Sequence, residues 1–279
     1  MAKILRDSLF INSILLNSEV WYNLSKSNIE DLEKLDNILL KKICEIPSSA
    51  PSAFLHLELG TVPIRFILKT RRLLFLQYIL QEEENSLLNK FLVAQIMEPM
   101  AGDWWLSILE DMEDFNLTFT NYEIKNMKKE VFKKKVKHAA SEAAFKWLNG
   151  KKAELKKMKD IQYKKLEIQD YLLSPSLSTH QTKFLLQLRS RMLPLRTNYR
   201  KMYKDDICPL CSFSGQGERF SDSQQHLLSC NVLSSDTDIN EIDLRYSDIF
   251  GSDVNKQSKM TILLSNKYKK RKNLEEKSN

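Results

Sequence analysis

The sequence predicts a mainly α-helical protein, with a helical bundle-like body and a small Cys/His element towards its C-terminal end. Only six glycines and seven prolines occur in 279 residues, which argues against a loop-rich all-β fold. Apolar residues recur at every third or fourth position in several segments, as they do on amphipathic helices. Three of the four cysteines and one of the four histidines share a window of 23 residues, which indicates a local Cys/His structure.

The first predicted segment, residues 1–100, is helical. Ser27 and Glu30 match a capping box, in which each side chain bonds the backbone of the other. Prolines and serines interrupt the helical pattern at 47–52, and a further helix is expected over 64–80. The apolar positions of the first helix have helical spacing: Ile29, Leu32, Leu35, Leu39 and Ile43.

Two residues of this segment have reactive side chains in apolar surroundings. Cys44 lies on the first helix, where the role of a small buried apolar residue is favoured. His56 lies in the apolar stretch 54–59, which favours a hydrogen-bonded core histidine over a ligand or catalytic group.

The second predicted segment, residues 101–175, is helical and changes charge along its length. Residues 101–124 contain six acids and no lysine or arginine, and Trp104 and Trp105 are expected there as core anchors rather than as base-stacking platforms. Fifteen lysines then face four acids over residues 125–165. The apolar set with approximate helical spacing is Ile124, Met127, Val131, Ala139, Ala143 and Trp147, followed by a helix stop at Asn149-Gly150.

The lysines on the opposite face of this helix predict a basic stripe. Lys133, Lys134 and Lys137 are its candidate nucleic-acid contacts, because clustered cations neutralise phosphates. Charge runs are unspecific, so a solvated face that keeps the protein soluble is an equal interpretation.

The third predicted segment, residues 176–235, begins with a helix that Ser178 and Gln181 can cap. From Lys183 to Lys204 the chain has seven basic residues and no acid. Guanidinium groups bind phosphates through two parallel hydrogen bonds, so the arginines are the stronger nucleic-acid candidates. They are Arg189, Arg191, Arg196 and Arg200.

The same segment contains the Cys/His motif C-x2-C-x14-H-x3-C. Its members are Cys208, Cys211, His226 and Cys230, and thiolates and imidazole are the ligands that tetrahedral Zn²⁺ prefers. Four protein ligands leave no open coordination position, so a structural Zn²⁺ is predicted rather than a catalytic one. The alternative is an accidental grouping of reduced cysteines.

The fourth predicted segment, residues 236–279, is acidic up to Asp253 and ends in a basic tail that is expected to be a frayed helix or disordered. A clustered Cys/His set without a signal-like apolar N-terminus predicts an intracellular protein, in the nucleus or the cytoplasm, that is not secreted. No run reaches the roughly 18–20 apolar residues that span a bilayer, so no membrane partner is expected.

Taken together, these segments resemble the C-terminal region of reverse transcriptases from non-LTR (LINE-type) retrotransposons. The resemblance implies a region that follows the palm and binds template RNA or target DNA, with a zinc-knuckle-like element formed by the four Cys/His residues. The matching stretches are Ala53–Gly60, Pro63–Arg65, Arg71–Leu76, Gly102–Trp104, Leu188–Met192, Asn198-Tyr199, Cys208–Cys211, Gln225–Cys230 and Tyr246–Phe250.

The catalytic signatures of that family are missing from the sequence. No aromatic-Ala-Asp-Asp polymerase motif occurs, Asp205-Asp206 lies in a charged linker, and the residues after Cys230 show no nuclease pattern. We therefore expect a non-catalytic nucleic-acid-binding fragment, with RNA or DNA as its partner. The alternative is a helical protein-interaction module in which zinc is purely structural.

Overall fold

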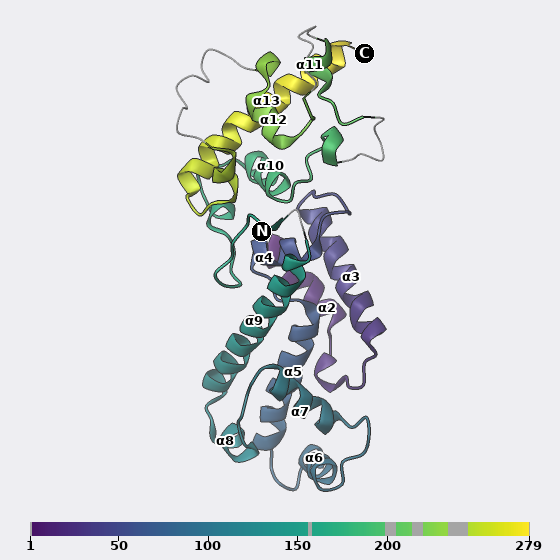
Figure 1. Cartoon of the computed structure of the whole chain (residues 1–279). Coiled ribbons are helices and arrows are strands. Elements are labelled where there is room, and N and C mark those ends of the chain that lie inside the picture. Colours follow the sequence, from purple (N-terminus) through teal and green to yellow (C-terminus); the bar gives the residue numbers. More distant parts are fainter. Residues whose placement is uncertain (1, 156–157, 199–204, 214–219, 234–244, 279) are drawn as a thin grey trace. The chain divides into compact units, whose positions relative to one another are not determined.

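The computed structural model confirms the mainly α-helical fold (Figure 1). The residues it describes are 2–155, 158–198, 205–213, 220–233 and 245–278. Within those ranges the only β pairing is an isolated antiparallel bridge between Ile207 and Ser221. No helix in them is long and apolar enough to cross a lipid bilayer.

The chain divides into two compact units, each assembled from separate stretches of sequence. Unit 1 contains Met1–Ile43, Leu55–Lys152 and Lys164–Glu167. Unit 2 contains Cys44–Phe54, Ala153–Tyr163 and Ile168–Asn279. The limits of these units differ from those of the four segments defined on the sequence, because residues far apart in the chain pack together.

Unit 1 is built around the long helix α5 (Ile64–Gln81). Its core joins α5 to the helix α9 (Lys129–Ala153) and to the shorter helices between them (Figure 1). The other helices of the unit are α1 (Ala2–Leu5), the π-helix η1 (Arg6–Ile11), α2 (Asn12–Ile14), η2 (Ser18–Val20), α3 (Lys26–Ile43), α6 (Leu87–Met97), α7 (Trp104–Asp114) and α8 (Asn121–Asn126). The helix α4 (Ser52–Leu59) has its first three residues in unit 2 and its remaining residues in unit 1.

Aromatic side chains fill the core of unit 1. Phe66 of α5 packs edge-on against Trp147 of α9, with ring centroids 6.1 Å apart. Trp104 is 7% exposed and donates from Nε1 to the carbonyl of Glu19 at 3.0 Å, and Trp105 packs against the same core. The prediction that these tryptophans anchor the core is confirmed.

Buried ion pairs tie the helices of unit 1 together. Arg72 of α5 donates two hydrogen bonds of 2.7 Å to Asp111 of α7. Arg6 donates two bonds of 2.6 Å to Asp36 of α3, and both partners are 1% exposed. Each buried charge therefore has a bidentate partner, which offsets the cost of removing it from water.

Two residues of the first segment are buried as predicted. His56 is 4% exposed; its Nε2 donates to Asn37 Oδ1 at 3.1 Å, which leaves Nδ1 to accept from the Thr61 hydroxyl at 2.8 Å. Cys44 is 6% exposed, and burial raises the pKa of its thiol to about 11. Both interpretations from the sequence are confirmed.

Local details of the helices differ from the prediction. The cap of α3 is Ser25, whose hydroxyl accepts the N–H of Asn28 at 3.1 Å. The helix begins at Lys26, so the predicted cap Ser27 lies inside it. Helix α9 continues through Gly150 to Ala153 rather than stopping there. The helix α5 at Ile64–Gln81 agrees closely with the predicted 64–80.

Unit 2 combines two longer helices with short turns. The helix α10 (Thr179–Arg189) begins at the predicted capping box of Ser178 and Gln181, which is confirmed. The helix α13 (Val254–Ser278) covers the stretch expected to be frayed or disordered. The remaining elements are η4 (Asp170–Leu172), η5 (Arg196–Asn198), α11 (Pro209–Phe213), α12 (Gln224–Ser229), η6 (Asn231–Leu233) and η8 (Tyr246–Phe250).

Candidate metal centre

A short backbone pairing positions the first two cysteines of the motif. Cys208 donates its N–H to the carbonyl of Phe220 at 2.8 Å, beside the isolated bridge between Ile207 and Ser221. The chain then enters α11, in which the N–H of Ser212 bonds the carbonyl of Cys208 at 3.2 Å. One helical turn thus places Cys211 near Cys208.

The second pair of ligands comes from α12, with His226 inside the helix and Cys230 directly after it. Ser223 caps this helix by accepting the N–H of His226 at 3.1 Å, and Cys230 follows its last residue. The ring of Phe220 stacks on the imidazole of His226, with centroids 5.1 Å apart. This stack restricts the rotation of the imidazole, which fixes the direction of its ligand nitrogen.

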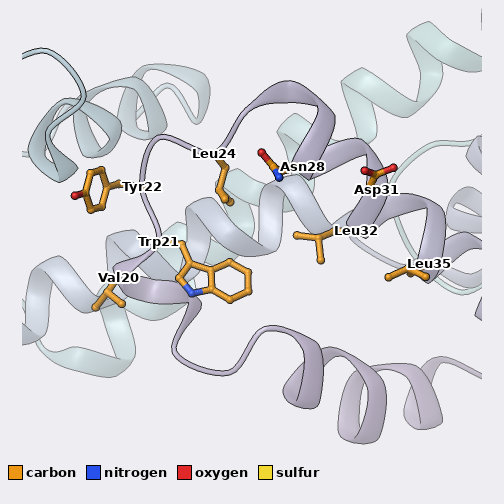
Figure 2. A pocket seen from close by; sticks show the side chains of 8 residues that line it. All are labelled: Val20, Trp21, Tyr22, Leu24, Asn28, Asp31, Leu32 and Leu35. Carbon is orange, nitrogen blue, oxygen red and sulfur yellow. The ribbon is translucent and has the colours of Figure 1, made fainter.

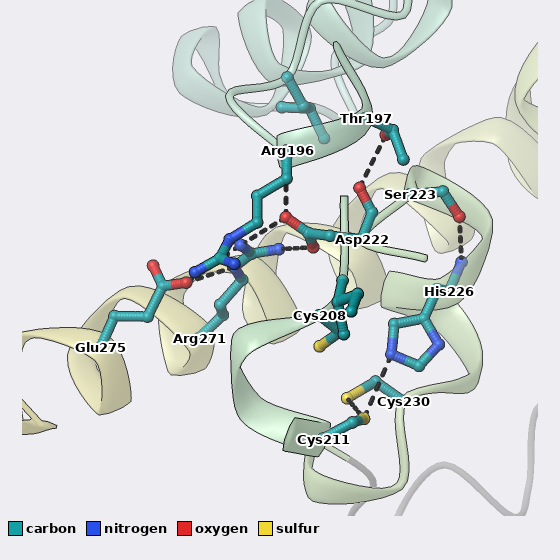
Figure 3. Close-up of polar contacts among 12 residues, drawn as sticks. Arg196, Thr197, Cys208, Cys211, Asp222, Ser223, His226, Cys230, Arg271 and Glu275 are labelled. Carbon is teal, nitrogen blue, oxygen red and sulfur yellow. Dashed lines mark hydrogen bonds and ion pairs between the residues drawn. The ribbon is translucent and has the colours of Figure 1, made fainter. Parts of the chain in front are cut away.

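The structure brings the four predicted ligands together (Figure 3). Their donor atoms all lie within 4.8 Å of one another, and all four side chains are at most 9% exposed. Sγ of Cys211 is 3.3 Å from Nε2 of His226 and 3.6 Å from Sγ of Cys230. Donors of a tetrahedral zinc site stand about 3.5–3.8 Å apart, so the cluster has the dimensions of a metal site.

The thiols of the cluster have unequal pKa values. The pKa of Cys208 is raised to about 12 by its hydrogen bond with Cys230 and by burial, and the N–H of Cys211 acts in the opposite direction. The pKa of Cys230 is lowered, chiefly because the thiol of Cys208 donates to its sulfur. Three thiolates so close together repel one another, and a bound cation removes that repulsion.

A buried ion pair supports the cluster from α13. Asp222 is 1% exposed and pairs through both carboxylate oxygens with Arg271, one of the bonds being Nη2–Oδ2 at 2.9 Å (Figure 3). The same carboxylate accepts the N–H of Arg196 at 2.8 Å, and the carbonyl of Asp222 accepts the hydroxyl of Thr197 at 2.7 Å. Asp222 therefore joins three stretches of chain next to the ligands.

Helix α13 also reaches the segment that contains His226 and Cys230. Lys267 is 5% exposed and donates to the carbonyl of Leu228 at 2.7 Å. Sequence reasoning missed Asp222, Lys267 and Arg271. Their roles depend on partners 39 to 49 residues away, and no local pattern reveals such pairs.

The three predicted phosphate-binding arginines within the described residues have internal partners. Arg189 is 2% exposed, donates from Nη1 to the carbonyl of Ile249 at 2.7 Å, and lies over the ring of Tyr171. The prediction of Arg189 as a nucleic-acid contact is corrected, because a buried guanidinium with these partners does not reach a phosphate.

The other three arginines differ in their accessibility. The side chain of Arg191 is 29% exposed and pairs with Asp160. The side chain of Arg196 is 28% exposed and pairs with Asp205 through a bond of 2.6 Å. Arg200 lies outside the described residues. The described arginines thus stabilise unit 2, and those with exposed atoms already have acidic partners.

The predicted lysines belong to α9 of unit 1. Lys134 and Lys137 are exposed, and Lys133 is half-buried. The side chains that α9 buries are Phe132, Val136, Ala140, Ala144 and Leu148. This buried stripe is one residue further along than the predicted one, and Val131 is 44% exposed. The lysines nevertheless remain on the solvent side of the helix.

Comparison of the chain with protein-family models, with curated proteins and with solved structures finds no match.

Proposed function

We propose that this chain is a non-catalytic nucleic-acid-binding protein whose unit 2 is stabilised by a structural zinc ion. The observation that supports it best is the lysine-rich solvent face of α9. The resemblance of the sequence to the C-terminal region of non-LTR retrotransposon reverse transcriptases agrees with this proposal, and RNA or DNA is the proposed partner.

Zinc is the proposed metal because of the donor set. Three sulfurs and one imidazole nitrogen suit Zn²⁺, whereas Mg²⁺ and Ca²⁺ take oxygen ligands. Cys208, Cys211, His226 and Cys230 would fill all four tetrahedral positions, which leaves no place for a substrate or an activated water. When bound, the ion would hold α11 and α12 together and replace the thiol protons.

The proposed nucleic-acid surface is the N-terminal half of the lysine-rich region. Glu130 is the only acid between residues 125 and 141. The N-terminus of α9 adds the positive end of the helix dipole to the field of these lysines. We define the α9 lysine face as Lys128, which directly precedes the helix, together with Lys129, Lys133, Lys134, Lys135 and Lys137.

A salt titration tests this surface. We expect a fluorescent single-stranded oligonucleotide to bind the full chain with an affinity that falls steeply as salt rises. Replacing Lys133, Lys134 and Lys137 by glutamine should lower the slope of log affinity against log salt by about 2, at about 0.7 for each phosphate contact. No detectable binding by the wild-type chain at low salt would reject the proposal.

A matched control separates contact from net charge. Lys34, Lys42 and Lys90 are exposed lysines of unit 1 outside α9, and their replacement by glutamine removes the same charge. We expect this control to keep most of the wild-type slope. Equal losses in the two triple variants would show that only the overall charge matters.

One observation favours a second function, the docking of a protein partner. Unit 1 has an open cavity of about 590 Å³ between η2 and α3 (Figure 2). Its lining is mainly apolar, with Trp21, Leu24 and Leu32 among its residues, and Tyr22 and Leu35 are each 53% exposed. Docking at this cavity does not depend on the α9 lysine face, so the salt titration distinguishes the two functions.

A further inference from the structure

A second cavity, of about 590 Å³, lies within unit 2. It is formed by the stretch 45–47, by α10 with the residues after it, and by α13. Its floor is apolar, with Ile46, Phe184 and Met192 each at most 6% exposed. The volume falls within the range of pockets that bury small organic ligands.

An aromatic ring lines this cavity. Tyr268 of α13 is half-buried, and its ring centroid lies 5.6 Å from that of Phe184, with the planes tilted by 42°. The ammonium group of Lys272 lies 5.2 Å from the centroid of the Tyr268 ring. A flat ring beside a flexible cation is the combination with which proteins bind a base and its phosphate.

The rim of the cavity is positively charged. Lys269 and Lys272 are exposed, and His180 stands on the α10 side. Glu45 is the only acid that lines the cavity in the described part of the chain, and it pairs with Lys183. Glu45 is therefore already neutralised, and two lysines remain to attract an anion.

Two polar side chains of the lining have hydrogen-bonding groups. Gln187 and Ser265 line the cavity, and Nε2 of Gln187 donates to the carbonyl of Glu45 at 3.0 Å. An amide and a hydroxyl next to an apolar floor suit the edge of a heterocyclic base, which has both donors and acceptors.

We infer that this cavity binds one nucleotide of a single-stranded nucleic acid. The base packs against Tyr268 and the apolar floor, and the phosphates on either side of it meet Lys269 and Lys272. A stacking ring next to two exposed lysines favours this occupant over an apolar peptide, which has no use for the lysines. The inference rests on the proposed function and adds a second contact point to it.

Helix α13 connects this cavity to the metal centre. Lys267 and Arg271 bond the segments that hold the metal ligands, whereas Ser265, Tyr268 and Lys272 line the cavity. The three cavity residues are spaced i, i+3 and i+7 and therefore share one face of the helix. Lys267 and Arg271, four residues apart, lie on a neighbouring face. Loss of the metal is therefore expected to weaken binding in the cavity.

The first experiment changes the rim lysines. Lys269→Gln/Lys272→Gln removes two phosphate contacts, each of which contributes about 0.7 to the slope of log affinity against log salt. With equal binding of variant and wild type at 1 M salt as the reference, the variant should bind a fluorescent 12-nucleotide single strand about 25-fold more weakly than the wild type at 0.1 M salt. The control Lys256→Gln/Lys259→Gln removes the same charge from exposed positions of the same helix. We expect it to bind within about twofold of the wild type.

The second experiment tests the stacked base. Tyr268→Ala should lower affinity by about five- to 150-fold and leave the salt slope unchanged, while Tyr268→Phe retains binding. Tyr122→Ala, at an exposed tyrosine of unit 1, serves as the control. Circular dichroism and metal content check whether Tyr268→Ala remains folded. An unfolded variant is replaced by Tyr268→Leu, for which the same loss is expected.

Two outcomes would overturn the inference in different ways. If the rim pair binds like its control while the α9 lysine variant loses affinity, the cavity is not a nucleotide site and the proposed function stands. If the wild-type chain binds no single strand at low salt, both fail.

Discussion

Buried polar and charged residues in both units have specific partners. Asp222 with Arg271 and Arg72 with Asp111 are bidentate pairs between helices or turns that are far apart in sequence. Removing one member of such a pair leaves an uncompensated buried charge, which typically costs about 3–5 kcal/mol. These pairs therefore fix the relative positions of elements inside each unit.

His56 gives unit 1 a defined response to acid. Its pKa is lowered from 6.5 to about 3, first by burial and then by the charge of Arg6, while a hydrogen bond with the backbone of Thr61 acts in the opposite direction. The unfolded chain takes up this proton below about pH 6.5, and the folded chain does not. The contribution of His56 to stability is thus complete above pH 6.5 and falls towards pH 3, by up to about 1.4 kcal/mol per pH unit.

Urea unfolding at pH 7.5, 6.0 and 5.0 checks this response. We expect His56→Gln to be less stable than the wild type at pH 7.5, and its stability to change less than that of the wild type between pH 7.5 and 5.0. His138→Gln is the control, because the side chain of His138 is 72% exposed. An unchanged pH dependence in His56→Gln would contradict the assignment.

At the scale of elements, α9 shows why a buried helix face is hard to predict from spacing alone. Val131 and Trp147 fit one apolar stripe, and Phe132, Val136 and Leu148 fit another that is rotated by about 100°. The structure buries the second stripe, in which Ala140 and Ala144 join the core around α5. The choice depends on which partner surface fits, and the local sequence does not contain that surface.

Gly150 gives a test of this helix. It lies inside α9, and an added Cβ would meet no atom within 4 Å. We expect Gly150→Ala to raise the free energy of unfolding by about 0.5–1 kcal/mol, because alanine loses less backbone entropy in a helix. Thermal and urea unfolding measure the change.

Gly102 is the matched control for that substitution. Its φ is +88°, and a Cβ there would lie 3.3 Å from Nδ2 of Asn23. We expect Gly102→Ala to lower stability, because residues with a Cβ rarely adopt this conformation. A stabilised Gly102→Ala or a destabilised Gly150→Ala would contradict this account.

For the whole molecule, local patterns predicted what depends on short spacings. The helical class, the helix at 64–80 and the proximity of Cys208, Cys211, His226 and Cys230 are of this kind. The burial of Arg189 could not be predicted in this way, because its partner Ile249 is 60 residues away in the sequence. A helix in the C-terminal tail was one of two alternatives, but the length and packing of α13 were not predicted, since its buried polar residues Lys267 and Arg271 look like a solvated tail in sequence.

The two units should respond differently to loss of the metal. We expect about one zinc per wild-type chain and a clear reduction in Cys211→Ser. Hydrogen exchange should become faster in α11, α12 and α13 of unit 2 and remain unchanged in α5 and α9 of unit 1. Cys44→Ser, which lies outside the cluster, should keep the metal.

Metal analysis and hydrogen-exchange mass spectrometry on the full chain measure both effects. A wild-type chain with freely reactive thiols and no bound metal would reject the zinc site. Faster exchange in α5 of the Cys211→Ser variant would show that the two units do not fold separately.

The division of unit 2 along the sequence has a consequence for biosynthesis. Ile46 and Ala50 are at most 6% exposed, yet their unit is complete only when α13, about 200 residues later, has been translated. At about 5–20 residues per second, this apolar stretch waits roughly 10–40 s beside the ribosome. During that interval we expect this apolar stretch to be exposed to solvent and to chaperones, until α13 emerges and covers it.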